Sequence, residues 1–147
     1  MIDFDLKTVD QKIGGLNMGL CPGAFTGKES LQSTVYVAES AFSFLEPSIR
    51  KHSPAFARAY SHWGVTEILR PEWQNIIQDW ERVRGNLAAA KTAQDLGSFC
   101  VIPRELENEF EERFEAGKTG LLNLLDQLID WLRVTLSTHD QVSVLGI

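Results

Sequence analysis

Two adjacent stretches decide which fold the chain is expected to adopt: Arg104-Glu-Leu-Glu-Asn-Glu-Phe-Glu-Glu-Arg-Phe-Glu115 and Leu121-Leu-Asn-Leu-Leu-Asp-Gln-Leu-Ile-Asp-Trp-Leu-Arg-Val-Thr-Leu136. The first contains six Glu and two Arg, and its apolar residues Leu106, Phe110 and Phe114 recur every four positions. The second is apolar almost all the way round a helix. A charged amphipathic helix beside a nearly all-apolar one is typical of a helical bundle, with the apolar helix at the centre and the acidic helix at the rim.

Helix-start signals divide the rest of the chain. Thr26 and Glu29 match a capping box, and the apolar residues that follow are spaced three or four apart. Ser53-Pro54 is typical of a second helix start. Helices are therefore expected over 29–45, 53–64, 71–97, 103–116 and 121–138.

Three glycines inside this pattern carry their own predictions. Gly85 lies within the apolar stripe of the third helix, where a glycine is about 1 kcal/mol less favourable than Ala, so a kink or break is expected there. Gly117 and Gly120 lie between the acidic and the apolar stretch and predict a short turn.

The predicted fold class is mainly α: a single domain, 1–147, built as a bundle of five or six helices. Its parts are an irregular Gly-rich segment (1–28), a helical core (29–138) and a C-terminal tail (139–147). Residues 2–6, residues 99–102 and the tail have short extended patterns that allow a small minor sheet. The predicted core residues are Leu31, Val35, Phe42, Trp73, Ile77, Trp80, Phe110, Leu121, Leu125, Leu128 and Leu132.

Composition excludes several classes of function. A net charge of −6 and the lack of a Lys/Arg cluster argue against nucleic acid as a ligand. An acidic start and the lack of a long uncharged apolar run predict a cytoplasmic protein with no membrane association. No cofactor or metal is predicted: the segment from Gly23 to Lys28 has one residue too few between its glycines for a phosphate-binding loop, and Glu29 stands where Ser or Thr is required.

The acidic stretch is the candidate binding site. Counted at 100° per residue, its carboxylates point away from the apolar stripe, so they share one exposed environment and are unsuited to acid–base catalysis. Clustered charge of one sign favours docking of an oppositely charged protein. The predicted partner-binding residues are Glu105, Glu109, Glu111, Glu112 and Glu115.

The predicted function is therefore a non-catalytic cytoplasmic protein-binding role, most concretely an acidic immunity protein that neutralises a basic toxin such as a nuclease. Two alternatives stay open. One is a small hydrolase or transferase with Cys21, in the Gly-rich segment, as nucleophile and His52, His62 or His139 as base. The other is a structural subunit that oligomerises through an apolar helix face.

Overall fold

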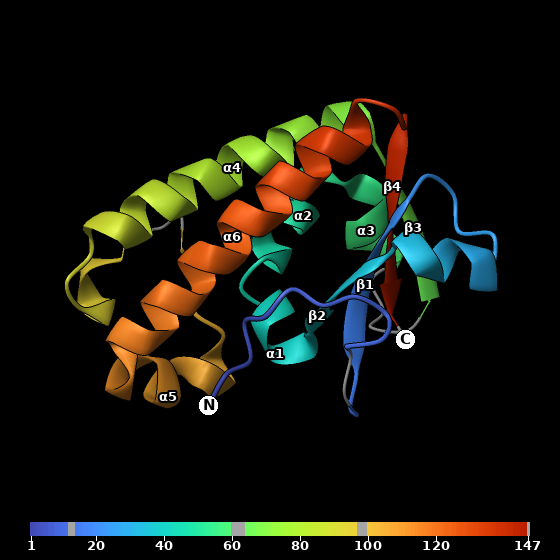
Figure 1. The fold of residues 1–147 in the computed structure, drawn as a ribbon. Helices are drawn as coiled ribbons and strands as arrows, with labels where there is room; N and C mark the ends of the chain where they lie inside the picture. Colours follow the sequence, from blue (N-terminus) through green and yellow to red (C-terminus); the bar gives the residue numbers. More distant parts are fainter. Residues whose placement is uncertain (12–13, 60–63, 97–99, 147) are drawn as a thin grey trace.

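A four-stranded antiparallel sheet and six α-helices make up the fold of the described residues, which are 1–11, 14–59, 64–96 and 100–146 of the computed structural model. The fold is therefore mixed α/β (Figure 1). The prediction of a mainly α bundle with a minor sheet is wrong.

The sheet has the order β2-β1-β4-β3, and all neighbouring strands are antiparallel. Its strands are β1 (Asn17–Pro22), β2 (Val35–Ala38), β3 (Gly64–Leu69) and β4 (Gln141–Gly146). Of the three segments expected to form a sheet, only the C-terminal tail does so, as the central strand β4. Residues 2–6 and 100–102 form no strand, and Phe99 lies outside the described residues.

The helix predicted over 29–45 is wrong. This segment consists of a 3-10 helix, η1 (Lys28–Ser33), strand β2 and the short helix α1 (Glu39–Phe42). The sequence Val35-Tyr36-Val37 contains two β-branched residues and one aromatic residue, which favour a strand. Tyr36 and Val37 are both buried because they point to opposite faces of the sheet, and both faces are covered.

Two short helices, α2 (Glu46–His52) and α3 (Pro54–Ala59), precede strand β3. The backbone N–H of Phe56 donates to Ser53 Oγ at 3.2 Å, which is the capping bond expected from the Ser-Pro pair. Helix α4 (Arg70–Ala89) follows β3 directly and runs through Gly85 without a break. The 3-10 helix η2 (Ala93–Asp95) follows α4, and the predicted helix end at Gly97 lies outside the described residues.

The acidic stretch and the apolar helix join differently from the prediction. The 3-10 helix η3 (Arg104–Leu106) leads into α5 (Glu107–Glu112), and the chain bends at Arg113, where φ is −119° and ψ is 41°. Helix α6 (Phe114–Leu136) then continues through both glycines that were expected to form a turn. These glycines allow close packing instead: a Cβ on Gly117 would lie 2.8 Å from the ring of Phe110, and one on Gly120 would lie 2.7 Å from the ring of Phe4.

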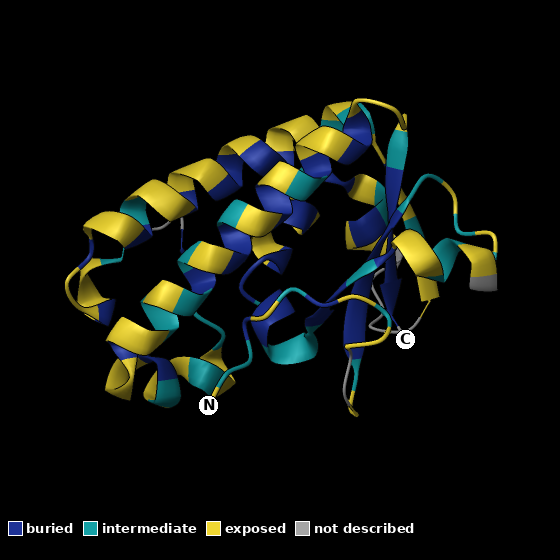
Figure 2. Ribbon diagram, in the orientation of Figure 1, coloured by how far each residue is buried: buried dark blue, intermediate teal, exposed yellow. Residues whose placement is uncertain are grey.

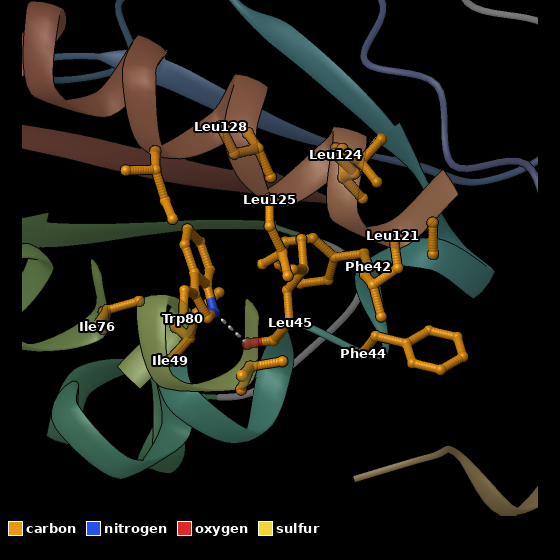
Figure 3. Packing of buried hydrophobic residues seen from close by; sticks show 14 of the residues in the cluster. Phe42, Phe44, Leu45, Ile49, Ile76, Trp80, Leu121, Leu124, Leu125 and Leu128 are labelled. Carbon is orange, nitrogen blue, oxygen red and sulfur yellow. Dashed lines mark hydrogen bonds between the residues drawn. The ribbon is translucent and has the colours of Figure 1, made fainter. Parts of the chain in front are cut away.

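The core lies between one face of the sheet and the helices. Helices α4 and α6 lie side by side (Figure 1), with their exposed residues facing away from the core (Figure 2). The indole of Trp80 donates to the carbonyl of Leu45 at 3.4 Å (Figure 3), and that of Trp73 donates to the carbonyl of Val142 in β4 at 3.1 Å. All the predicted core residues are buried except Leu31 and Val35, which are half-buried.

The other face of the sheet is covered in part by the segment that contains η1. Cys21, Tyr36 and Leu145 are buried there, apart from the main core. Ser143 Oγ, also buried, donates to the carbonyl of Gly23 at 2.8 Å and fixes this segment to β4. Within the described ranges, none of the helices combines the length and the apolar character that a membrane crossing requires.

Candidate functional site

The glutamates of η3, α5 and the start of α6 gather at the end of the molecule farthest from the sheet (Figure 1), here called the acidic end. Four of the predicted site residues, Glu105, Glu111, Glu112 and Glu115, are exposed, and none of them forms an ion pair within the described residues. Glu109 is less exposed, at 36% of its side chain, and pairs with the amino group of Met1 at 2.8 Å. Glu107 is exposed as well and extends the predicted set.

Two carboxylates on the outer faces of α4 and α6 form ion pairs, in contrast to most of those of the acidic end. Asp126 pairs with Arg84, and Glu81 pairs with Arg133, in both cases across the α4–α6 contact. Paired charges cancel at a distance, whereas unpaired charges of one sign add. The unpaired glutamates of the acidic end therefore reinforce one another's negative field.

A groove with a volume of about 350 Å³ opens beside these glutamates. It runs between the N-terminal segment and the helices α5 and α6. Its lining consists of Met1, Ile2, Asp3, Phe4, Asp5, Glu109, Phe110, Arg113, Ala116, Gly117 and Gly120. The groove thus has an apolar floor, carboxylates on both sides and one cationic side chain, that of Arg113.

The floor of the groove rests on a chain of aromatic contacts. The ring of Phe110 lies 5.2 Å from that of Phe44 and 5.6 Å from that of Phe114, and the ring of Phe4 lies 5.5 Å from that of Phe44. These rings are held in place by one another, because tilted and edge-to-face contacts at such distances are favourable. Together with the glycines of α6, they give the groove a fixed shape.

Asp3 and Asp5 were not among the predicted site residues, although they line the groove. Burial opposes the ionisation of Asp3, but its hydrogen bonds to Lys7 and to the backbone N–H of Asp5 hold its pKa below the ordinary value. The sequence signal was the alternation of acidic and apolar residues over 2–6. This pattern predicts a strand. In the structure, the ring of Phe4 packs against Gly120 of α6, and Asp3 and Asp5 line the groove.

The alternative in which Cys21 is a nucleophile in an accessible loop does not fit the surroundings of the thiol. Cys21 lies within strand β1 and is fully buried, and its sulfur contacts the carbonyls of Pro22 and Ser30. Cys100 is buried too, and burial raises the pKa of its thiol to about 11. Neither thiol is accessible in the way that a nucleophile needs to be.

The candidate bases are dispersed. His52 Nε2 lies 2.8 Å from Asp79 Oδ2, and Lys51 and Arg82 contact the same buried carboxylate at 3.4 and 3.0 Å. Burial opposes the ionisation of Asp79, but its hydrogen bonds to His52 and Lys51 and their charges hold its pKa below the ordinary value. This network joins α2 to α4 and serves packing.

His139 contacts Thr138 and Thr135 near the start of β4, and His62 lies outside the described residues. Among the described residues, no three His, Cys, Asp or Glu side chains are grouped closely enough to hold a metal ion. Comparison of the chain with protein-family models, with curated proteins and with solved structures found no match.

Proposed function

We propose that this chain is a non-catalytic cytoplasmic protein that binds a basic protein through the acidic end and blocks it, as an immunity protein blocks a toxin. The observation that carries the proposal is the groove, whose apolar floor formed by Phe4 and Phe110 lies beside the helix α5 that bears the exposed glutamates Glu111 and Glu112, which form no ion pair within the described residues. A protein interface needs both elements: charge for steering and a desolvated apolar anchor for affinity.

The chemistry of the acidic end suggests the kind of surface that it binds. An enzyme that cleaves nucleic acid must attract phosphate, so its active cleft is lined by Lys and Arg. Carboxylates on a rigid scaffold can accept hydrogen bonds from those side chains in place of phosphate oxygens. The apolar floor suits the methylene stem of an inserted Lys or Arg, since these stems pack on apolar surface.

The test is reversal of charge at Glu105, Glu109 and Glu112. Wild type and the triple Lys variant are used as bait in the native cell extract, and captured proteins are quantified by mass spectrometry. A basic protein is expected to bind the wild type and to be lost from the variant. Each lost charge-assisted hydrogen bond is worth about 1.5–3 kcal/mol, so the loss of all three lowers the affinity of the purified pair by at least about 1,000-fold.

A matched triple variant supplies the control. Asp10, Glu29 and Asp130 are exposed carboxylates outside the acidic end, and their change to Lys alters the net charge by the same amount. This control is expected to retain the partner. Equal capture by wild type and both variants, or loss of the partner from both variants, would contradict the proposal.

A further inference from the structure

Strand β3 is an open edge of the sheet. The opposite edge, β2, is bridged by Lys7, whose N–H donates to the carbonyl of Tyr36 at 2.9 Å and whose carbonyl accepts from the N–H of Tyr36 at 2.7 Å. On β3, the side that faces away from β4 has no backbone partner within residues 1–11, 14–59, 64–96 and 100–146. Unpaired edges of this kind can accept an added strand.

The register identifies the free backbone groups. Leu69 stands opposite Gln141 in β4, and one position further the N–H of Arg70 donates to the carbonyl of Asp140 at 2.8 Å. In an antiparallel pair, hydrogen-bonded positions alternate with positions whose polar groups point outward. The N–H and carbonyl groups of Val65 and Glu67, and the N–H of Leu69, therefore point away from the sheet, whereas the carbonyl of Leu69, the N-cap residue of α4, accepts the first hydrogen bond of that helix.

The side chains of these three residues share one face of the strand and form an apolar–acidic–apolar row. Val65 is 48% exposed and Leu69 is 54% exposed, and both belong to the few large apolar residues at the described surface. Glu67 stands between them, exposed and without an ion pair in the described part of the chain. The row therefore offers two apolar contacts around one unneutralised charge.

Glu67 also selects the occupant. If a second copy paired with this edge so that Val65 met the other copy's Leu69, the two Glu67 carboxylates would stand directly opposite each other. Like charges in that position are destabilising, and edge charges are a known means of preventing self-pairing. A strand with Lys or Arg opposite Glu67 and apolar residues opposite Val65 and Leu69 would neutralise the carboxylate and cover both apolar side chains.

We propose that β3 accepts an extended segment of another protein as a fifth strand, with a basic residue opposite Glu67 and apolar residues two positions to either side. Backbone hydrogen bonds from Val65, Glu67 and Leu69 give the affinity, and the alternating side chains give the specificity. The proposal goes beyond the acidic end, which lies at the other end of the molecule (Figure 1), and does not depend on it.

The probes are two capped heptapeptides, Thr-Val-Thr-Lys-Thr-Val-Thr and the same peptide with Glu in place of Lys. Binding is followed through the backbone amide signals of β3 in ¹⁵N NMR spectra at low salt. Wild type is expected to bind the Lys peptide about tenfold more tightly than the Glu peptide, since opposite charges replace like charges across the strands. The Glu67→Lys variant is expected to reverse this preference.

Glu29→Lys, an exposed change of the same charge on η1, is the control and keeps the wild-type preference. Glu67→Val removes the charge that opposes self-pairing, so it is expected to self-associate in light scattering. Equal binding of the two peptides, signals that shift only outside β3, or no shift at about 1 mM peptide would overturn the proposal. None of these results bears on the glutamates of the acidic end.

Discussion

The role assigned to Gly117 can be tested against Gly85, because both lie inside long helices but differ in their surroundings. Around Gly85 no atom lies within 4 Å of the position that a Cβ would take, whereas at Gly117 a Cβ would lie 2.8 and 2.9 Å from two ring atoms of Phe110. The two substitutions to Ala therefore make the same change in helix propensity but differ in packing.

The magnitudes follow from these surroundings. Replacement of a helical Gly by Ala stabilises a helix by about 1 kcal/mol, and Gly85→Ala should show this gain. Gly117→Ala adds an overpacking cost of about 1–3 kcal/mol, because the ring of Phe110 is 1% exposed and is confined by Phe44 and Phe114. Its net effect is thus a loss of up to about 2 kcal/mol.

The assay is urea unfolding of wild type and both variants, followed by far-UV circular dichroism and tryptophan fluorescence. With a slope of about 1–3 kcal/mol per M for a domain of this size, the two midpoints should differ by about 1 M. If Gly117→Ala stabilises the protein as much as Gly85→Ala does, Phe110 is not packed against α6 and the floor of the groove is not as described.

Three further outcomes are expected. Although burial opposes its ionisation, hydrogen bonds and charges from His52 and Lys51 hold the pKa of Asp79 below its unfolded value of about 3.9, so its ionised form stabilises the fold fully above that value and progressively less as the pH falls through the folded pKa. Asp79→Asn should therefore cost about 1–3 kcal/mol of unfolding free energy at about pH 6, and this cost should fall as urea titrations are repeated at lower pH. Cys21 and Cys100 should react with iodoacetamide at least about tenfold more slowly than a free thiol at neutral pH until urea unfolds the chain. Arg133→Ala, which removes an exposed ion pair with Glu81, should change the free energy of unfolding by less than about 1 kcal/mol.

The long helices could be predicted from the sequence because their apolar stripes are regular. Trp73, Ile77 and Trp80 in α4 are buried as their spacing indicates, and so are the predicted core leucines of α6, which are Leu121, Leu125, Leu128 and Leu132. The glycines of α6 could not be assigned without the partner rings, because a packing glycine and a turn glycine look the same in a sequence.

The strands were harder to predict. The spacing of Val35, Ala38 and Phe42 fits a helix as well as a strand followed by a helix, and the β-branched pair around Tyr36 was the signal that decided between them. Strand β1 gives almost no signal. It contains Gly19, where a Cβ would lie 3.0 Å from a Thr34 methyl and 3.2 Å from the Tyr36 ring. Glycine is therefore required at this position by close packing, although its strand propensity is low.

Of the five carboxylates predicted to be exposed, Glu105, Glu111, Glu112 and Glu115 are exposed, whereas Glu109 is half-buried and pairs with the amino group of Met1; the groove was not predicted. Helical geometry alone places Glu105 and Glu112 in solvent. The groove needs Asp3 and Phe4 beside α6, a contact between segments more than a hundred residues apart that no local pattern specifies.

The position of β4 in the middle of the sheet affects how the chain folds during its synthesis. Ser143 binds the carbonyl of Gly23 from 120 positions away, and β1 and β3 do not pair with each other, so neither can complete its hydrogen bonds before β4 leaves the ribosome. At a synthesis rate of about 5–20 residues per second, the strand Val65-Thr-Glu-Ile-Leu69 waits for several seconds with both edges unpaired. During this interval Glu67 disfavours antiparallel pairing of the strand with a copy of itself, because like charges directly opposite each other are destabilising.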